Sequence, residues 1–412
     1  MFIKLISSTE QLLSLREDWN LLAAGHPLRS WQWAISWAQT MLGDDKLQVL
    51  VGYDSDERAV GIAPFYFQRT WTQGNIFRLI GDERCCTDYS GILADPNFED
   101  VFIESIASWL ATGKLPANTN SHPTGQAITF YDDEKPIVPE WDLIRLEATR
   151  AGDHAIQKLC QELEKRNGRA ITQHNYSSWQ IQFEGCWDSY VNQLSKSQRR
   201  NVRRVEKRVL NHPDFSVHIA DDSASFKKGM QWFRSLHQKH WELAGKTGCF
   251  SFPDFANFLE TAASRMYSND SLRIMWIENA GQPVAVDFSL LSDSTSFGYQ
   301  MGVDPDYRKL EVGRALQVLI MKSTLESGRA NFDFLRGDEA YKSRWNAKET
   351  KLLEIEIAPE RLLAQIQQNL THLGRSLKNA WLDWPNPNWQ TGIIQTATIC
   401  PRKGCRTRRC RH

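Results

Sequence analysis

The chain has 412 residues, of which 41% are hydrophobic and 24% charged, and its 49 Lys and Arg residues balance 49 Asp and Glu residues. This length exceeds what one hydrophobic core supports and predicts two domains, while the zero net charge excludes a global attraction to nucleic acid or to an anionic membrane. No run approaches the roughly eighteen apolar residues of a membrane span, and residues 1–8 lack the length and the cleavage site of a signal peptide. We therefore expect a soluble, cytoplasmic protein.

The two halves of the chain show the same succession of predicted elements. In the first half, helical periodicity followed by two extended runs around a turn predicts two helices and a hairpin, at 10–24, 30–42, 47–53 and 59–67. In the second half, the same elements are predicted at 224–243, 255–267, 272–278 and 283–291. The succession recurs about 225 positions later, which indicates an internal duplication.

The second copy is predicted to continue where the first does not. A third strand over 296–303 is followed by a loop over 304–311, a helix over 312–327 and a short strand over 331–335. Antiparallel strands followed by such a crossover predict an α+β fold with segregated helices, and not a doubly wound sheet.

The whole chain divides into five predicted segments. They are a degenerate first copy, a bridging segment with a basic helix, a second copy, an amphipathic helix and a disordered basic tail: 1–150, 151–210, 211–358, 359–384 and 385–412. The tail holds Cys400, Cys405, Cys410 and His412, whereas the other cysteines are scattered without the spacing of a zinc site. We expect no disulfide framework and no metal.

The segment 307–315, YRKLEVGRA, lies between a predicted strand and a predicted helix. Backbone N–H groups leading into a helix N-terminus are a common cradle for a pyrophosphate, and small residues there let the backbone approach the ligand. This makes Arg308, Gly313, Arg314 and Ala315 candidates for binding phosphates. An ordinary strand-to-helix loop with a capping glycine is the alternative.

The most specific segment is 332–347, FDFLRGDEAYKSRWNA. It resembles the end of the GNAT domain in CelD-type proteins, where a strand ends in Asp-Phe and is followed by Arg-Gly-Asp, Tyr-Lys and an Arg-Trp pair. The basic stretch 194–204 is also similar to that family, as is a pattern on the helix and loop before the second hairpin: His237, Trp241, Gly245 and Phe250. The resemblance covers residues 187–358, and the first half only as a degenerate copy.

This resemblance implies an α+β, tandem GNAT fold with mostly antiparallel mixed sheets flanked by helices. It also implies an acyltransferase that moves an acyl group, acetyl in the first instance, from acetyl-CoA or another acyl-CoA. The acceptor would be an amine or hydroxyl of a sugar or small metabolite, in bacterial polysaccharide biosynthesis. Gly313 and Ala315 match the last two places of the GNAT phosphate loop, whereas its first place falls on Leu310 and Arg308 lies two residues early.

Two residues are candidates for proton transfer. Tyr341 lies in the stretch where GNAT enzymes commonly carry the tyrosine that protonates the departing thiolate, although a tyrosine packed under the sheet is the alternative. Asp287 lies on the polar face of the strand 283–291, where an acid is unfavourable enough to suggest that it accepts the proton of the nucleophile. His240 or Glu242 is a competing base, and a solvated sheet face is the alternative for Asp287.

Further residues are candidates for substrate binding. Arg336 and Lys342 are predicted to bind a phosphate or a substrate carboxylate, with Asp338 orienting either of them, although a surface ion pair would have the same sequence. His240 and Trp241, on the helix before the second hairpin, are also predicted to contact the substrate.

Two other functions remain open. The basic helix carries seven cations around a narrow apolar stripe: Lys196, Arg199, Arg200, Arg203, Arg204, Lys207 and Arg208. Such a face attracts coenzyme A phosphates, an aminoacyl-tRNA backbone or a nucleotide-linked sugar, and it suits a Fem-type double-GNAT transferase that uses aminoacyl-tRNA. No aromatic residues interleave the cations, so we expect no dedicated nucleic-acid binding. The third function is a non-catalytic scaffold of a polysaccharide assembly complex.

Overall fold

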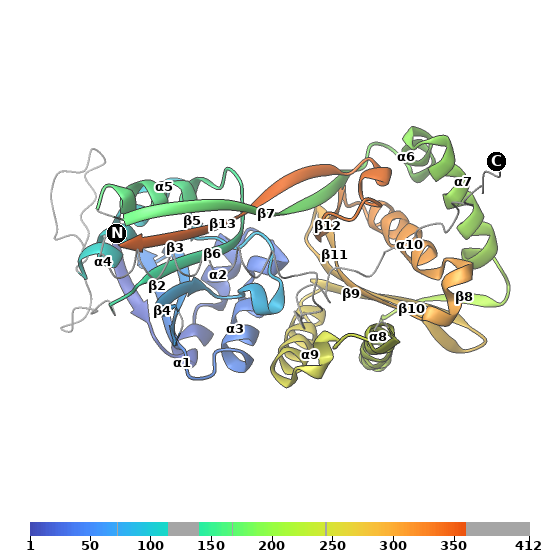
Figure 1. Cartoon of the computed structure of the whole chain (residues 1–412), viewed down its shortest axis with the longest axis horizontal. Coiled ribbons are helices and arrows are strands. Elements are labelled where there is room, and N and C mark those ends of the chain that lie inside the picture. The colour runs from blue at the N-terminus through green and yellow to red at the C-terminus, as the bar shows by residue number, and fades with distance from the viewer. Residues whose placement is uncertain (72, 114–139, 167, 244, 360–412) are drawn as a thin grey trace, which may run out of the picture.

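The structure is a computed structural model that describes residues 1–71, 73–113, 140–166, 168–243 and 245–359. Two lobes lie side by side, one formed by the first half of the chain and one by the second, and two long strands connect them (Figure 1). The predicted basic tail with its cysteines, and the predicted C-terminal helix from residue 360 on, lie outside the described residues.

The helices and strands follow one another along the chain as two similar sets. The α-helices are α1 (Thr9–Leu13), α2 (Arg16–Leu22), α3 (Trp31–Thr40), α4 (Glu99–Thr112), α5 (His154–Glu164), α6 (Trp187–Gln193), α7 (Lys196–Val205), α8 (Ser223–Leu243), α9 (Pro253–Tyr267) and α10 (Val312–Glu326). The strands are β1 (Phe2–Ile6), β2 (Lys46–Tyr53), β3 (Ala59–Thr70), β4 (Gly74–Leu79), β5 (Leu93–Ala94), β6 (Leu143–Arg150), β7 (Gly168–Gln182), β8 (Phe215–Ile219), β9 (Leu272–Asn279), β10 (Gln282–Leu291), β11 (Thr295–Val303), β12 (Asn331–Arg336) and β13 (Lys348–Pro359).

One sheet runs through both lobes in the order β1-β2-β3-β4-β6-β13-β7-β12-β11-β10-β9-β8, with β5 paired to β3. In each half, antiparallel neighbours are followed by one parallel pair, β4 with β6 and β11 with β12. A parallel pair needs a crossover connection, which α4 supplies in the first half and α10 in the second. The strands β11 and β12 pair only from Thr295 to Phe297, and beyond this point they separate.

The strands β7 and β13 exchange partners between the halves. They pair with each other along β13, from Pro359 with Gly168 to Lys348 with Gln180. In addition, β13 pairs with β6 of the first half, while the end of β7 pairs with β12 of the second. Each half therefore completes the sheet of the other.

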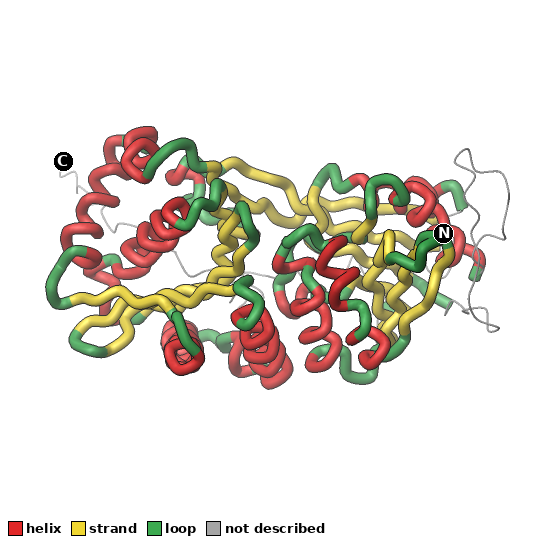
Figure 2. The backbone as a smooth tube through the Cα atoms, turned by 180° about the vertical axis from the view of Figure 1, so that it is seen from behind, coloured by secondary structure: helices red, strands yellow, loops and turns green. Residues whose placement is uncertain are grey.

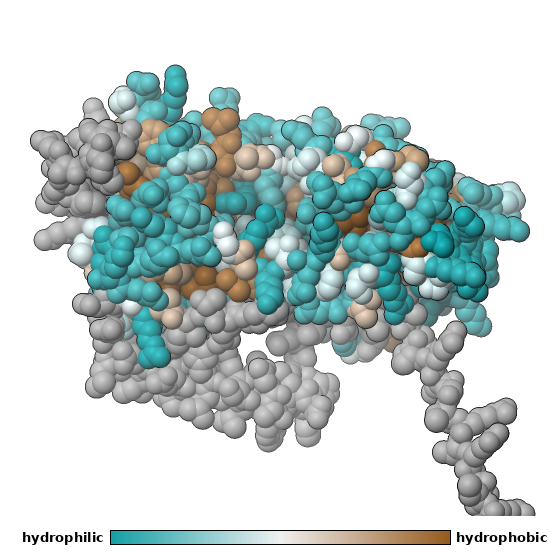
Figure 3. Space-filling view, turned by 90° about the horizontal axis from the view of Figure 1, so that it is seen from above, coloured by the Kyte–Doolittle hydropathy of each residue, from teal (hydrophilic) through white to brown (hydrophobic). Residues whose placement is uncertain are grey.

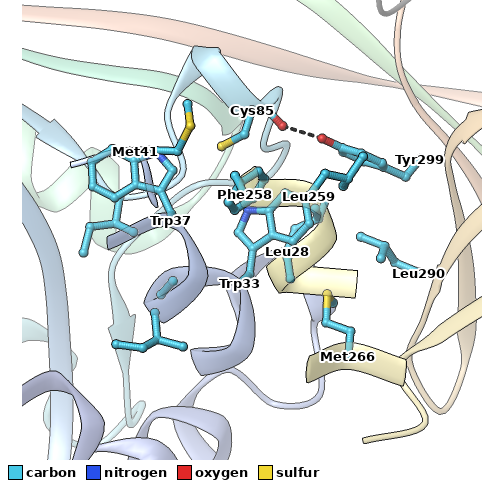
Figure 4. Packing of buried hydrophobic residues seen from close by; sticks show 14 of the residues in the cluster. Leu28, Trp33, Trp37, Met41, Cys85, Phe258, Leu259, Met266, Leu290 and Tyr299 are labelled. Carbon is cyan, nitrogen blue, oxygen red and sulfur yellow. Dashed lines mark hydrogen bonds between the residues drawn. The ribbon is translucent and has the colours of Figure 1, made fainter. Parts of the chain in front are cut away.

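The lobes also share a hydrophobic core. Helix α3 of the first half packs on α9 of the second, with the rings of Trp33 and Phe258 edge to face at a centroid distance of 4.8 Å (Figure 4). Trp31, Trp33 and Trp37 are all buried in this core. Two further cores lie one in each half, under α4 and α5 in the first and under α6, α7 and α10 in the second. Seen from behind, helices flank the strands in both lobes (Figure 2). Hydrophobic cores therefore lie on both faces of the sheet in each half, whereas the edge strand β8 is largely exposed.

The structure confirms the elements predicted for the second copy and corrects those of the first. The prediction that the first copy stops after its hairpin is wrong, because β4, α4 and β6 continue it as β11, α10 and β12 continue the second. These elements give weak signals: β4 is short, and α4 begins after Phe98 without a side-chain cap. The helix predicted over 10–24 is two helices, α1 and α2.

The face in Figure 3 is mainly hydrophilic, with smaller hydrophobic areas between. Among the residues that the structure describes, no helix combines the length and the apolar character needed to cross a membrane.

Candidate active site

A cavity of about 60 Å³ lies where β11 and β12 separate. Both strands line it, helix α10 covers it, and a short loop of the first half reaches it. The polar residues that bear on its chemistry are Asp287, Gln300, Gln317, Arg336, Tyr341 and Lys342. Because a single water needs a cavity of about 10–15 Å³, this cavity has room for a group of a few heavy atoms.

The turn that follows β12 is closed by Lys342. Its ammonium donates to the backbone carbonyls of Leu335, Arg336 and Gly337 at 3.1, 2.8 and 3.1 Å, and only 2% of the residue is exposed. Leu335 and Gly337 both have positive φ, at 57° and 123°, so the chain bends sharply here. The turn places Tyr341, next to Lys342, in the cavity with its ring 5.9 Å from that of Phe334.

Arg336 is also held inside the protein. Its guanidinium forms an ion pair with Asp88 of the first half and donates to the carbonyl of Thr87 at 2.6 Å. The structure therefore engages Arg336 with the first half and Lys342 with backbone carbonyls, although both line the cavity. Asp338, predicted to orient one of them, lies exposed on the surface.

Asp287 and Tyr341 line the same cavity and have perturbed pKa values. Only 1% of Asp287 is exposed, and burial raises its pKa to about 7, against the opposing effects of a hydrogen bond from Ser289 and the charge of Arg273. The Ser289 hydroxyl donates to Asp287 Oδ2 at 2.6 Å. Burial, with the charge of Glu339 as a smaller cause, raises the pKa of Tyr341 above its ordinary value. At neutral pH, Asp287 thus exchanges protons readily and the phenol of Tyr341 remains protonated.

The predicted phosphate loop ends at the N-terminus of α10. Gly313 is partly buried there, and a Cβ atom at this position would lie 3.2 Å from Cγ2 of Val303 at the end of β11. The carboxylate of Glu311 accepts hydrogen bonds from Nε and Nη2 of Arg204 at 2.9 and 2.5 Å and pairs with Arg314. The structure thus brings Gly313 and Arg314 to the helix N-terminus and adds Arg204 from the basic helix.

The remaining predicted residues are dispersed around this region. Arg308 is exposed on the helical turn η5 (Pro305–Leu310), and Ala315 is buried in the core of the second half. On α8, Trp241 is only 2% exposed and donates from Nε1 to Nε2 of His237 at 3.2 Å. His240 is partly buried, and burial followed by the charge of Arg308 lowers its pKa. His240 and Trp241 do not line the cavity.

Sequence reasoning missed several residues with polar side chains that line the cavity, among them Cys86, Asp88, Gln300, Gln317 and Glu339. Gln300 is 4% exposed, and its Nε2 has no hydrogen-bond partner among the described residues, so it offers a donor. A polar residue on a strand otherwise rich in apolar residues was the signal for Gln300. Nothing in the sequence indicates that Cys86 and Asp88 lie beside residues some 250 positions later.

Residues 196–343 match the family model of the acetyltransferase (GNAT) domain. This part of the chain, which holds α10, Tyr341 and most of the residues that line the cavity, is thus similar to the GNAT acetyltransferase domain. Among the described residues, no group of three His, Cys, Asp or Glu side chains is arranged to hold a metal ion. No curated protein matches the sequence at a significant level.

Solved structures resemble the chain over both halves. FemX is 11% identical, with 82% of this chain and 95% of FemX covered and a TM-score of 0.56. A C-terminal DUF2156 domain from Agrobacterium fabrum is 10% identical, with 89% and 98% covered and a TM-score of 0.50. A tandem GNAT protein from the clavulanic acid biosynthesis pathway is 8% identical, with 86% and 98% covered and a TM-score of 0.42. The predicted fold class is confirmed: two similar sets of helices and strands share one mostly antiparallel sheet, residues 196–343 match the GNAT domain, and FemX has a similar fold over both halves.

Proposed function

We propose that the chain is an acyltransferase that moves an acetyl group from coenzyme A to an amine or hydroxyl of a sugar or small metabolite. The observation that supports this most is the cavity between β11 and β12, which is lined by both Asp287 and Tyr341. The polysaccharide context rests only on the resemblance of residues 187–358 to CelD-type proteins.

In this reaction the nucleophile bonds to the carbonyl carbon of the thioester, the carbon–sulfur bond breaks, and the departing thiolate takes up a proton. Asp287, directly or through a water, accepts the proton of the nucleophile. Tyr341 donates its proton to the sulfur. Asp287 then releases one proton to solvent and Tyr341 regains one from solvent, so the net result is one proton moved from the nucleophile to the thiol. Burial opposes the charge on a thiolate as it does on a phenolate, so the raised pKa of Tyr341 does not preclude this transfer.

The donor is proposed to approach from the N-terminus of α10. Gly313 keeps the backbone open there, and Arg204 and Arg314 supply positive charge for the phosphates. The amide of Gln300 offers a hydrogen bond to the acyl carbonyl in the cavity. The proposal requires that the phosphates displace Glu311 from the two arginines.

The size of the cavity favours a short acyl group. A volume of about 60 Å³ accommodates an acetyl group, whereas a long acyl chain would have to extend out of the cavity. Isothermal titration with acetyl-CoA and octanoyl-CoA, together with release of free thiol in the presence of a panel of amines and amino sugars, tests this. We expect binding and turnover of acetyl-CoA and at least about tenfold weaker use of octanoyl-CoA. Absence of binding and turnover with either donor would overturn the proposed function.

A second candidate, transfer from aminoacyl-tRNA, is favoured by one observation. On α7 and the π-helical turn η3 (Glu206–Leu210) that follows it, the positions spaced three to four residues apart are exposed cations: Lys196, Arg200, Arg203 and Lys207. This stripe lies opposite the buried Val202 and Val205 and suits a phosphate backbone. Binding of charged tRNA that weakens steeply with salt, without any binding of acetyl-CoA, would favour this candidate over the first.

A further inference from the structure

A loop of the first half enters the candidate site of the second. This junction loop, residues 85–90, begins at the last residue of the helical turn η2 (Glu83–Cys85). Every residue of the loop is buried. Two of its side chains, Cys86 and Asp88, line the cavity between β11 and β12. The first half therefore contributes directly to the walls of this cavity.

Hydrogen bonds join the junction loop to both of the separated strands. The hydroxyl of Tyr299 on β11 donates to the carbonyl of Cys85 at 2.8 Å (Figure 4). On β12, the backbone N–H of Arg336 donates to Asp88 Oδ2 at 2.6 Å, and its guanidinium pairs with Asp88 Oδ1. The hydroxyl of Tyr89 donates to Asp333 Oδ2 at 2.7 Å. The loop thus fixes the strands at the point where they part.

The junction loop is also anchored in its own half. The backbone N–H of Tyr89 donates to the carbonyl of Ala148 at 2.9 Å, and the hydroxyl of Thr87 accepts from Trp33 Nε1 at 2.8 Å. Cys86 and Tyr89 have left-handed backbones, with φ of 49° and 63°. Non-glycine residues adopt this conformation at a cost, and such strain concentrates at functional sites. Two strained residues within a single loop that lines a cavity fit that pattern.

The contacts of Asp88 lead directly to Tyr341. Asp88 fixes both the backbone and the guanidinium of Arg336, and is itself 0% exposed. Arg336 begins the turn that Lys342 closes through three backbone carbonyls, and Tyr341 lies in this turn. Removing the charge of Asp88 would leave the Arg336 guanidinium buried without its counterion.

We propose that Asp88 of the first half is a positioning residue for acyl transfer in the second half, holding the turn 336–342 so that Tyr341 stays in the cavity. This inference rests on the proposed function. It means that the first copy completes the active site of the second and is more than a remnant of a duplication.

The experiment compares Asp88→Asn with Asp82→Asn. Asp82 is a matched control because it is also buried and also pairs with an arginine, Arg84, but lies wholly within the first half. For Asp88→Asn we expect kcat for acetyl-CoA to fall at least about tenfold with its KM little changed, and amide hydrogen exchange across 336–342 to accelerate. For Asp82→Asn we expect neither change, even if its melting temperature falls as much as that of Asp88→Asn.

A milder pair covers the case in which Asp88→Asn does not fold. Tyr89→Phe removes the hydroxyl that donates to Asp333, and Tyr66→Phe removes the one that donates to Asp82 at 2.5 Å. A lower kcat in Tyr89→Phe alone supports the proposal. The proposal is overturned if the two variants within a pair have equal kcat. It is also overturned if amide hydrogen exchange across 336–342 is equally fast in the two variants. Failure of the proposed function is seen separately, as a wild-type protein that neither binds nor turns over acetyl-CoA.

Discussion

Asp287 and Tyr341 lie more than fifty positions apart in the sequence, but Asp287 on β10, the neighbour of β11, and Tyr341 in the turn after β12 line the same cavity. The alternation along β10 directs Asp287 and Ser289 to one face, where Arg273 is their charged neighbour. The ammonium of Lys342 donates hydrogen bonds to three backbone carbonyls of the turn and thereby positions the neighbouring Tyr341. Each candidate group thus depends on buried polar partners that fix its geometry.

Replacing Tyr341 by phenylalanine should remove the proton donor and leave the shape of the cavity intact. We expect kcat to fall by about 100-fold or more while the dissociation constant of acetyl-CoA changes little, as for loss of a general acid. Stopped-flow turnover and isothermal titration measure the two quantities. Tyr190→Phe is the matched control, because Tyr190 is buried in the same core and its hydroxyl donates to the carbonyl of Trp345 at 2.7 Å. Equal kcat in the two variants would remove Tyr341 from the mechanism.

The raised pKa of Asp287 predicts how activity and stability depend on pH. Activity should rise as the pH passes through about 7, since the carboxylate is the base, and Ser289→Ala should shift this rise to higher pH. The free energy of unfolding should fall as the pH rises, because folded Asp287 keeps up to about pH 7 a proton that the unfolded chain releases near pH 4. Relative to Asp287→Asn, the wild type should lose about 2–3 kcal/mol of stability between pH 5 and pH 8. Urea unfolding of both proteins at the two pH values measures this difference, and parallel curves would contradict the assignment.

At the scale of single elements, the N-terminus of α10 is the proposed entry of the donor. Gly313→Val should weaken acetyl-CoA binding about tenfold, since a side chain there crowds both Val303 and the backbone N–H groups. The double variant Gly313→Val with Val303→Ala relieves the contact within the protein, so it should regain stability but not affinity. Isothermal titration and thermal unfolding of both variants distinguish the two effects. Unchanged affinity would place the phosphate site elsewhere.

Periodicity predicted the elements that bear long amphipathic or alternating patterns, such as α8, β9, β10 and α10, because local sequence determines them. It missed β4 and α4, whose signals are short or uncapped, and β13, whose pairing with β6 and β7 depends on distant residues. Among the candidate residues, a motif pointed to Tyr341 and strand alternation to Asp287, and both line the same cavity in the structure. Asp88 was not, because its role arises only when the two halves meet.

At the scale of the whole molecule, the exchange of β7 and β13 and the core shared by α3 and α9 join the two halves. Neither half retains a complete sheet without the other, so they should unfold together. We expect differential scanning calorimetry of the full chain to give one transition, with equal calorimetric and van't Hoff enthalpies. Two separate transitions would show that the halves are independent and would weaken the role given to the junction loop.

The proposed function requires that the acyl group reacts in the cavity between β11 and β12. A crystal structure of the protein with bound acetyl-CoA tests this most directly. We predict the pyrophosphate at the N-terminus of α10 and the acetyl group between the two strands, within hydrogen-bond reach of Tyr341 and Gln300. Two results would contradict this prediction. One is acetyl-CoA bound between β4 and β6 of the first half, and the other is a crystal structure in which side chains fill the cavity and no acetyl-CoA lies at α10.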